Sequence, residues 1–541
     1  MNLWNALTEG SSRGVLHAWS GESFAHTPWR DVVRDARGMA AELRRVGVRP
    51  GTRVAAVLTN TPDTVRGLLA IWLAGGAVAS LPLPTRGQGP DEYTRQLAIL
   101  AVQLEPAVIV VDGQLADLVP IELTAHVPLR TWSSLYGTGR IEPSPPGPDD
   151  VAFIQYSSGS TSTPKGCALT TRAIEAQLEI ILRLTGGHPG AETVASWLPL
   201  SHDMGMFGCL LYSWAYDYHF VLSSPERFGM MPRTWFRDMS EYEATMTAGT
   251  STAVHLATRA QGRGDLPRPL RLRAAVIGAE RVDAAVLDAA VAKFRPHGLA
   301  DTAFQPAYGM AEATLAVAGK PHERAHHVRA FDADALVDGT VVEAAPDDER
   351  AVRLVSNGPA LPGVHLAAGD AGTVGEITVT SPSLARGYHA DPERTADRFR
   401  GGRLHTGDLG FLADGELYVV GRIDDMLSIG GRKVYASDIE AAVDSMAEIR
   451  KGCAAVVEAR GSGVPRLVLM VEPRGRRIDF GPVADRAAEV ALRKAGVALS
   501  ECLFLPPGTL PKTPSGKIQR FRCQEMIEDT GLRPLARIVL P

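Results

Sequence analysis

Residues 151–166 read VAFIQYSSGSTSTPKG, an apolar run followed by serines, threonines, glycines and a lysine. The run at 151–154 predicts a buried strand, and the stretch after it predicts a loop. Glycine lets backbone N–H groups approach an anion closely, hydroxyls donate hydrogen bonds, and lysine neutralises negative charge. The sequence therefore predicts a polyphosphate-binding loop made of Ser157, Ser158, Gly159, Ser160, Thr161 and Lys165.

Two better-known phosphate motifs do not explain this loop. Its spacing is neither the GxxxxGKS/T of P-loop proteins nor the GxGxxG of dinucleotide-binding folds. A solvated Ser/Thr turn is the alternative interpretation for any one such loop. The functional interpretation therefore depends on the motifs that accompany it.

Helical and strand patterns alternate around the loop. Apolar residues recur at helical spacing over 32–43 and 173–184, and short β-branched runs predict strands at 54–58, 107–111 and 272–277. Helices that alternate with such strands favour layers packed around mainly parallel sheets. The expected fold class is therefore α/β.

The pattern changes after Gly375. Short alternating strands at 376–380 and 416–420 predict a β-rich subdomain, and a compact α+β pattern follows, opening with a helix capped by Ser437. A chain of 541 residues is too long for a single core. We predict a large N-terminal domain of layered sheets and helices and a small mobile α+β C-terminal domain. The expected bounds are 1–423, with the β-rich subdomain at about 358–423, and 424–541.

Composition excludes several classes of function. The formal net charge of −5 provides no basic field for nucleic acid. The five cysteines form no CxxC pair, and the N-terminus has no signal-peptide pattern. The apolar run 67–83 is interrupted by Gly75 and Gly76, which predicts a buried helix leading into a buried strand. We expect a cytoplasmic protein with no membrane span and no nucleic-acid partner.

The phosphate loop resembles that of the adenylate-forming superfamily, which includes acyl-CoA synthetases, luciferases and peptide-synthetase adenylation domains. The family pattern is about SGSTGxPKG, and Ser162 stands where glycine is common. The stretch YGMAEAT at 308–314 is similar to the family's YGxTE motif. The resemblance implies that Tyr308 stacks on adenine, that Glu312 and Thr161 hold Mg²⁺, and that the nucleotide site includes Gly309, Met310 and Ala311.

Further motifs follow in the family's order. Gly278, Ala279 and Glu280 close the strand 272–277 and resemble the loop that flanks adenine. The HTGDLG stretch resembles the TGD motif, which implies that Asp408 accepts hydrogen bonds from the ribose hydroxyls, with Arg422 nearby. The PKTPSGK stretch implies that Lys517 stabilises charge at the reacting carboxylate and α-phosphate.

The stretch WLPLSHDMGM at 197–206 distinguishes branches of the superfamily. It is similar to the WLPLxHDMGL of fatty acyl-AMP ligases and unlike the PxFHxxG of many acyl-CoA synthetases. A polar mouth with an apolar lining suits a carboxylate with a long tail, although the methionines could equally be plain core residues. The resemblance implies a catalytic role for His202 and an acyl pocket of Trp197, His202, Asp203, Met204, Met206, Phe207, Thr247 and Gly249.

The chain between Glu312 and Asn357 is longer than the superfamily usually needs. At about 320–356 it resembles the family insertion of fatty acyl-AMP ligases, which is associated with their failure to use CoA. The sequence also ends shortly after Lys517, without a carrier domain. The resemblance therefore implies a separate partner, a holo acyl carrier protein that acts in trans.

The implied reaction uses ATP and Mg²⁺ to convert a carboxylic acid, expected to be a fatty acid, into acyl-AMP and pyrophosphate. The acyl group would then pass to the phosphopantetheine thiol of the carrier, in natural-product or lipid biosynthesis, after the C-terminal domain turns about Asp424. An acyl-CoA or aryl-CoA ligase shares every ATP motif and is the closest alternative. An amino-acid adenylating protein and a non-catalytic nucleotide-binding scaffold are the more remote ones.

Overall fold

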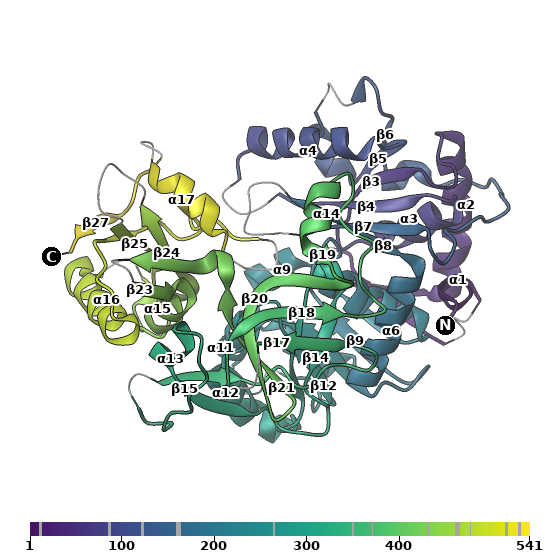
Figure 1. The fold of residues 1–541 in the computed structure, drawn as a ribbon. Coiled ribbons are helices and arrows are strands. Elements are labelled where there is room, and N and C mark those ends of the chain that lie inside the picture. The colour runs from purple at the N-terminus through teal and green to yellow at the C-terminus, as the bar shows by residue number, and fades with distance from the viewer. Residues whose placement is uncertain are drawn as a thin grey trace.

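The computed structural model describes the chain apart from residues 10–12, 85–87, 121–123, 158–163, 263, 265, 349–350, 370–371, 430–431, 460–465, 476–477, 514–517, 529–531 and 541. Figure 1 shows a large body that contains the N-terminus and a smaller body, coloured light green to yellow, that contains the C-terminus. The chain passes from the larger body to the smaller one after the strand β21 (Glu416–Arg422), through the turn η6 (Ile423–Asp425).

A six-stranded sheet in the order β6-β5-β3-β4-β7-β8 carries the two strands that flank the phosphate loop. Its strands are parallel except at the β7–β8 edge, which is antiparallel. Its strands are β3 Arg53–Val57, β4 Ala77–Leu81, β5 Val108–Val111, β6 Leu129–Thr131, β7 Val151–Ser157 and β8 Lys165–Thr170. The associated helices are α2 Trp29–Arg45, α3 Pro62–Leu73, α4 Pro90–Leu104, η1 Gly113–Leu118 and η2 Trp132–Leu135.

The second large sheet has eight strands in the order β14-β13-β12-β11-β9-β10-β1-β2, again parallel except at the two edges. The strands are β1 Val15–Trp19, β2 Phe24–Pro28, β9 Thr193–Ser196, β10 His219–Leu222, β11 Met246–Gly249, β12 Ala274–Ile277, β13 Phe304–Gly309 and β14 Ala316–Gly319. The helices around it are α1 Leu3–Thr8, α7 Asp203–Gly205, η3 Met206–Leu211, α8 Tyr212–Ala215, α9 Pro225–Met230, α10 Thr234–Glu241, α11 Ser251–Ala260, α12 Ala284–Phe294, η4 Arg295–His297 and η5 Ala311–Ala313.

Helix α6 (Thr171–Thr185) contacts both large sheets, since it packs on β7 and β8 and also on β14 and η3. Its bounds follow from local chemistry. The Thr170 side chain accepts a hydrogen bond from the Ala173 N–H at the start, and Gly186 ends the helix in the left-handed conformation. Most of its length is buried, which matches its apolar spacing in the sequence.

The chain after β14 forms an antiparallel hairpin and then a five-stranded antiparallel sheet. The hairpin pairs β15 (Val328–Asp332) with β16 (Ala351–Val355), and α13 (Ala333–Val337) lies between them in the chain. The sheet has the path β17-β18-β20-β19, with β21 paired to β20. Its elements are β17 His365–Ala368, β18 Gly375–Thr380, α14 Pro392–Arg398, β19 Phe399–Arg400, β20 Arg403–Ala413 and β21 Glu416–Arg422.

The smaller body has a four-stranded sheet in the order β24-β25-β26-β27 and its own apolar clusters, drawn from residues 434–540. Among the residues that the structure describes, three ion pairs join it to the larger body, namely Arg281–Asp438, Lys451–Asp283 and Arg522–Glu92. Its elements are η6 Ile423–Asp425, β22 Met426–Ile429, β23 Arg432–Tyr435, α15 Ala436–Val443, β24 Ile449–Ala459, β25 Arg466–Pro473, α16 Phe480–Ala495, β26 Glu501–Phe504, α17 Arg520–Glu528 and β27 Ala536–Val539.

The α/β fold with mainly parallel sheets is confirmed. The apolar run 67–83 is the end of α3 followed by β4, as predicted, and within the described part of the chain no helix is long and apolar enough to cross a membrane. One local prediction is wrong: Ser437 does not cap α15. The helix begins at Ala436 directly after strand β23, and the extended residue Tyr435 takes the cap position.

A buried ion pair is expected to stabilise the edge of the eight-stranded sheet, and its removal tests this role. Arg227 and Asp238 have side chains that are only 10% and 5% exposed, and Arg227 lies 4.1 Å over the ring of Trp19 on β1. We expect Asp238→Ala to lower the free energy of unfolding by about 3–5 kcal/mol, because it leaves a buried guanidinium unpaired. Urea unfolding followed by tryptophan fluorescence measures this change.

The matched control is Asp149→Ala. Its partner Arg172 is 62% exposed and Asp149 itself is 83% exposed, so water replaces the lost ion pair. The control should unfold at the same urea concentration as the parent protein. Equal unfolding midpoints for the two variants would contradict the assigned role of the buried pair.

Candidate active site

A cavity of about 970 Å³ lies where the carboxyl ends of the two large sheets meet the smaller body. Its lining includes Leu83, which follows β4, and Gly278, which follows β12. Asp438 of α15 contributes from the C-terminal side. Ligands of open α/β sheets bind at this edge, so the cavity is the candidate site.

The phosphate loop is described only at its ends. Ser158, Gly159, Ser160 and Thr161 lie outside the described residues, and Ser157 is the last residue of β7. Ser157 lies opposite Lys165 in the antiparallel β7–β8 pairing, so the loop leaves and re-enters the sheet at one place. Lys165 lines the cavity. Burial lowers the pKa of its ammonium group, while the Glu312 carboxylate opposes that shift.

Glu312 lies in the turn η5, and its carboxylate accepts a 2.8 Å hydrogen bond from the hydroxyl of Tyr388. Tyr388 reaches this position because residues 386–389 pair with the edge strand β8, where the N–H of residue 389 donates to the carbonyl of Gly166. Lys165 Nζ lies 6.0 Å from the centre of the Tyr388 ring. Sequence reasoning missed Tyr388 because its segment matches none of the motifs.

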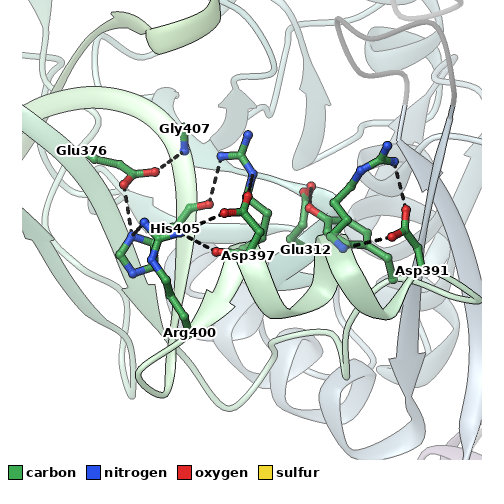
Figure 2. A network of polar contacts seen from close by, with 10 residues as sticks. Glu312, Glu376, Asp391, Asp397, Arg400, His405 and Gly407 are labelled. Atoms are coloured by element: carbon green, nitrogen blue, oxygen red, sulfur yellow. Dashed lines mark hydrogen bonds and ion pairs between the residues drawn. The ribbon is translucent and has the colours of Figure 1, made fainter.

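Positive side chains lie near Lys165 and Glu312. Arg394 and Arg398, on α14, and Arg422, on β21, add to the lowering of the Lys165 pKa, and the charge of Glu312 acts on both Lys165 and Arg422. Figure 2 shows Glu312 beside the helix on which Asp391 and Asp397 lie. A carboxylate that faces the cavity together with a lysine and an arginine suits a polyphosphate that arrives with a divalent metal ion.

Asp408 lies on β20 directly opposite Arg422 on β21. Its carboxylate accepts a 2.6 Å hydrogen bond from Tyr308 Oη and lies 3.4 Å from Arg422 Nε. Burial and the Asp408 charge raise the pKa of Tyr308, so its phenol stays a proton donor. The hydroxyl of Tyr308 therefore orients the carboxylate that the sequence assigned to the ribose.

Glu376 holds the turn before Asp408, as Figure 2 shows. Its carboxylate accepts from the N–H of Gly407 at 2.9 Å and lies 3.0 Å from His405 Nδ1. Gly407 has φ +75°, and an added Cβ would lie 2.7 Å from a guanidinium nitrogen of Arg398. The glycine of the TGD motif is therefore favoured by its left-handed backbone conformation, whereas the flexible end of Arg398 could move aside.

Gly278, Ala279 and Glu280 follow β12 and all line the cavity, as do Tyr308, Gly309, Met310 and Ala311. Ala279 has φ +65°, an uncommon conformation for a residue with a side chain and one that clusters at functional sites. Glu280 is fixed by the N–H of Thr252, which donates to it at 2.6 Å. The two segments predicted to flank adenine therefore face the same space.

His202 and Asp203 lie at the cavity wall, with His202 Nδ1 2.6 Å from Asp203 Oδ1. The six-stranded sheet holds in place the loop before His202. Asn60, which follows β3, donates to the carbonyl of Leu198 at 3.0 Å and accepts from the N–H of Leu200 at 3.0 Å. This buried asparagine belongs to no recognised motif, so sequence reasoning missed it.

The structure places four of the eight residues predicted for the acyl pocket on the cavity wall. His202, Asp203, Met204 and Thr247 line it. Residues 203–215 form one helical stretch whose middle, η3, is a π-helix, and Met204, Gly208 and Tyr212 face the cavity from it. The stretch therefore contributes two lining residues that the sequence did not indicate.

Four predicted wall residues do not line the cavity, which corrects the sequence-based prediction. Met206 and Phe207 point into the core from the same helical stretch and are fully buried. Trp197 stacks on Phe228 with ring centres 3.8 Å apart. Gly249 lies against Trp235, whose ring would be 2.5 Å from an added Cβ.

Lys517 lies outside the described residues. The residues on either side of the undescribed stretch, Thr513 and Ile518, both line the cavity. Arg520, nearby in the chain, pairs with Asp425 at 2.6 Å and with Glu440 at 2.5 Å. These buried ion pairs tie the end of the lysine-bearing segment to η6 and to α15.

The profile of the family described as AMP-binding enzyme matches residues 16–389. The chain belongs to this family. It is 30% identical to a protein of Caulobacter vibrioides (strain NA1000 / CB15N) named provisionally as an acyl-CoA synthetase, over 94% of this chain and 91% of that one. It is 28% identical to FadD30 of Mycobacterium tuberculosis (strain CDC 1551 / Oshkosh), named provisionally as a long-chain-fatty-acid–AMP ligase, over 96% and 95% of the chains.

Among solved structures, one from a study of fatty acyl-adenylate ligases from E. coli and L. pneumophila matches with a TM-score of 0.89 and 28% identity, covering 97% of both chains. The fatty acid AMP ligase of Legionella pneumophila matches with a TM-score of 0.73 and 25% identity, covering 99% of this chain and 98% of that one. The protein is therefore an adenylate-forming ligase, which activates an acid with ATP.

The contact between Tyr388 and Glu312 predicts a graded loss of activity. We expect Glu312→Gln to lower the rate of acid-dependent ATP–pyrophosphate exchange by about 100- to 1000-fold, the usual cost of losing one charged group at the reacting phosphates. Tyr388→Phe should cost about tenfold, because it removes one hydrogen bond to a charged group. Exchange assays at varied Mg²⁺ should show a raised Mg²⁺ requirement for both variants.

The control is Tyr136→Phe, which removes a similar hydrogen bond, 2.7 Å to Asp63, outside the cavity. It should exchange at the parent rate. If Tyr388→Phe also behaves like the parent at limiting Mg²⁺, Tyr388 does not position the carboxylate.

Proposed function

We propose that the protein is a fatty acyl-AMP ligase. It converts a fatty acid and ATP to acyl-AMP and pyrophosphate, and then transfers the acyl group to the phosphopantetheine thiol of a separate holo acyl carrier protein, in natural-product or lipid biosynthesis. The likeness to solved fatty acyl-adenylate ligases over nearly the whole chain supports this proposal. Because several relatives are named as fatty-acid–CoA ligases, an acyl-CoA ligase is the second candidate.

The position of the segment 320–356 supports the choice of a fatty acyl-AMP ligase over an acyl-CoA ligase. The helix α13 in this segment packs against α16 and β23 of the smaller body, and the strand β16 lines the cavity at residues 351–355. A segment that touches both the cavity and the C-terminal part can restrict how that part moves and what enters beside it. Exclusion of free CoA is the expected consequence.

In the proposed first half-reaction, the acid places its carboxylate near His202 and its apolar tail in the cavity. A carboxylate oxygen bonds to the α-phosphorus of ATP, the bond from that phosphorus to the bridging oxygen breaks, and pyrophosphate leaves with the electron pair. Asp408 accepts hydrogen bonds from the ribose, and adenine lies between Tyr308 and residues 278–280. Lys517 stabilises the charge that develops at the α-phosphate.

The described residues fit a Mg²⁺ ion that depends mainly on the substrate for its ligands. Among them, no group of three or more His, Cys, Asp or Glu could hold a metal, whereas Glu312 presents one carboxylate to the cavity. Mg²⁺ commonly binds through one or two carboxylates together with phosphate and water. Glu312, with Thr161 of the phosphate loop, would hold the ion, which supplies charge shielding for the triphosphate.

We further propose two domains, 1–423 and 424–541, with the hinge at Asp424. Asp424 lies in the short turn η6, between β21 of the large body and β22 of the small one. Two apolar clusters lie wholly within the described residues of the small body, which supports a domain that moves as a unit. Near the proposed hinge, Tyr435 packs instead with Phe331 and Tyr418 of the large body. The placement of Thr513 and Ile518 on the cavity wall fits the orientation needed for adenylate formation.

Product analysis separates the two candidates. The protein is incubated with ATP, Mg²⁺ and carboxylic acids of graded chain length, alone, with CoA, and with a holo acyl carrier protein, and products are identified by intact mass spectrometry. We expect acyl-AMP and acylated carrier without acyl-CoA. Abundant acyl-CoA would establish the CoA ligase instead.

Substitution of the hinge should separate the half-reactions. Asp424→Pro fixes φ at this position and restricts Ile423, so the turn cannot rearrange. We expect one half-reaction to stay within about threefold of the parent and the other to fall tenfold or more, because each needs its own domain orientation. ATP–pyrophosphate exchange and carrier acylation from supplied acyl-AMP measure the two halves separately.

Asp424→Ala is the control, since it removes the same carboxylate but leaves the backbone free. It should preserve both half-reactions. If Asp424→Pro also preserves both, the hinge lies elsewhere.

A further inference from the structure

The cavity continues inward from the nucleotide site along the strands of the eight-stranded sheet. Val194, near the start of β9, and Met246, the first residue of β11, both line it, so it reaches the amino-terminal side of these strands. Each strand has four residues, which corresponds to roughly 10 Å. The walls here are mostly apolar and are contributed by Ile181, Leu184, Gly208, Leu315 and Ala316.

Two hydroxyl groups interrupt this apolar lining. Thr185, the last residue of α6, and Tyr212, the first residue of α8, both line the cavity, and their oxygens lie 2.7 Å apart. Their residues are only 3% and 1% exposed. Polar groups buried beside an apolar chain are costly unless they are hydrogen-bonded, so the remaining bonding capacity of this pair matters.

The direction of the hydrogen bonds follows from proton counting. Thr185 Oγ1 donates its one proton to the carbonyl of Ile181 at 2.9 Å. The proton in the 2.7 Å contact is therefore that of Tyr212, and burial raises the pKa of this phenol, so it remains a donor. Thr185 Oγ1 has a second lone pair that these bonds leave open, whereas the Tyr212 oxygen also faces the hydroxyl of Tyr218. The pair can therefore accept a hydrogen bond from a ligand.

The part of the cavity that runs along β9 and β11 is called the tunnel. The neighbours of Thr185 and Tyr212 make their end of the tunnel its polar end. Arg273, which precedes β12, donates to the carbonyl of Thr185 at 2.6 Å and pairs with Glu192 at 2.5 Å. An added Cβ on Gly187 would lie 2.3 Å from Tyr212 Oη and 2.6 Å from Tyr218 Oη, so two phenol oxygens converge on one glycine. The contacts of Arg273 and Gly187 therefore hold the Thr185–Tyr212 pair in place from the side away from the cavity.

We propose that the Thr185–Tyr212 pair recognises a hydroxyl group on the acyl chain, remote from the carboxylate, and that the preferred substrates are hydroxylated fatty acids. The inference rests on the proposed function, since it takes the tunnel as the acyl site. A substrate hydroxyl donates to one oxygen of the pair, whereas a methyl group would leave that lone pair buried without a partner. Sites built this way discriminate against analogues that lack the hydroxyl.

The test compares pairs of fatty acids of equal chain length, one with a hydroxyl group on the terminal carbon and one without. The chain lengths run from six to about sixteen carbons, so that some chains are shorter and some longer than the tunnel. Acid-dependent ATP–pyrophosphate exchange gives kcat/KM for each acid. We expect at least one length at which the hydroxylated acid is preferred tenfold or more. Acids hydroxylated at carbon 3 should show no such preference, because that position lies near the carboxylate.

Variants assign the preference to the pair. In Tyr212→Phe and Thr185→Val the ratio of kcat/KM between hydroxylated and plain acid should fall toward one, while Thr185→Ser, which retains the hydroxyl, should keep it. The control Tyr216→Phe alters a neighbouring tyrosine that does not line the cavity and should keep the parent ratio. Melting temperatures show whether each variant is folded.

Two results would overturn the inference. One is a parent ratio near or below one at every chain length, and the other is a preference that survives in Tyr212→Phe, Thr185→Val and their double variant. Both leave the proposed function intact, because plain fatty acids are still activated. If no fatty acid of either kind supports exchange, the proposed function itself fails, and this inference fails with it.

Discussion

The amide of Asn60 joins the two large sheets at the point on which the site depends. Its Nδ2 donates to the carbonyls of Leu198 and Ser223, which follow β9 and β10, while Asn60 itself follows β3 of the other sheet. Its Oδ1 accepts from Leu200, so the amide makes three hydrogen bonds in a buried setting. Unmade bonds there would each be costly, and the carboxyl ends of both sheets are therefore held together.

This alignment lets one cavity combine two kinds of chemistry. The six-stranded sheet contributes Lys165, beside Glu312 and the arginines of the antiparallel subdomain, which together suit a charged nucleotide. The eight-stranded sheet contributes the apolar tunnel between its strands and α6. His202 and Asp203 lie between these regions, where an acid would present its carboxylate to the α-phosphate.

The sequence predicted the residues of this site better than their contacts. The motifs at 156–166 and 308–314 follow or form strands with parallel neighbours, whose carboxyl ends are the usual ligand-binding edge, so their place at the site was foreseeable. The motif at 405–410 lies on the antiparallel strand β20, and strand direction did not predict its position. Tyr388 was not foreseeable either, because it reaches Glu312 only through the pairing of 386–389 with an edge strand. Likewise, the motif did not indicate which of Met204 and Met206 faces the cavity. Two residues apart on a helical stretch, they point to different sides, and the structure places Met204 on the cavity wall and Met206 in the core.

The loop after β12 relates nucleotide binding to domain position. Residues 278–280 face the cavity, and the next residues pair with the smaller body, Arg281 with Asp438 and Asp283 with Lys451. Asp283 also caps α12, so its carboxylate cannot move without disturbing that helix. The proposed nucleotide contact and two of the ion pairs that hold the C-terminal part therefore lie on the same short loop. Any coupling between nucleotide binding and domain orientation at this place would run through direct contacts rather than a long path across the protein.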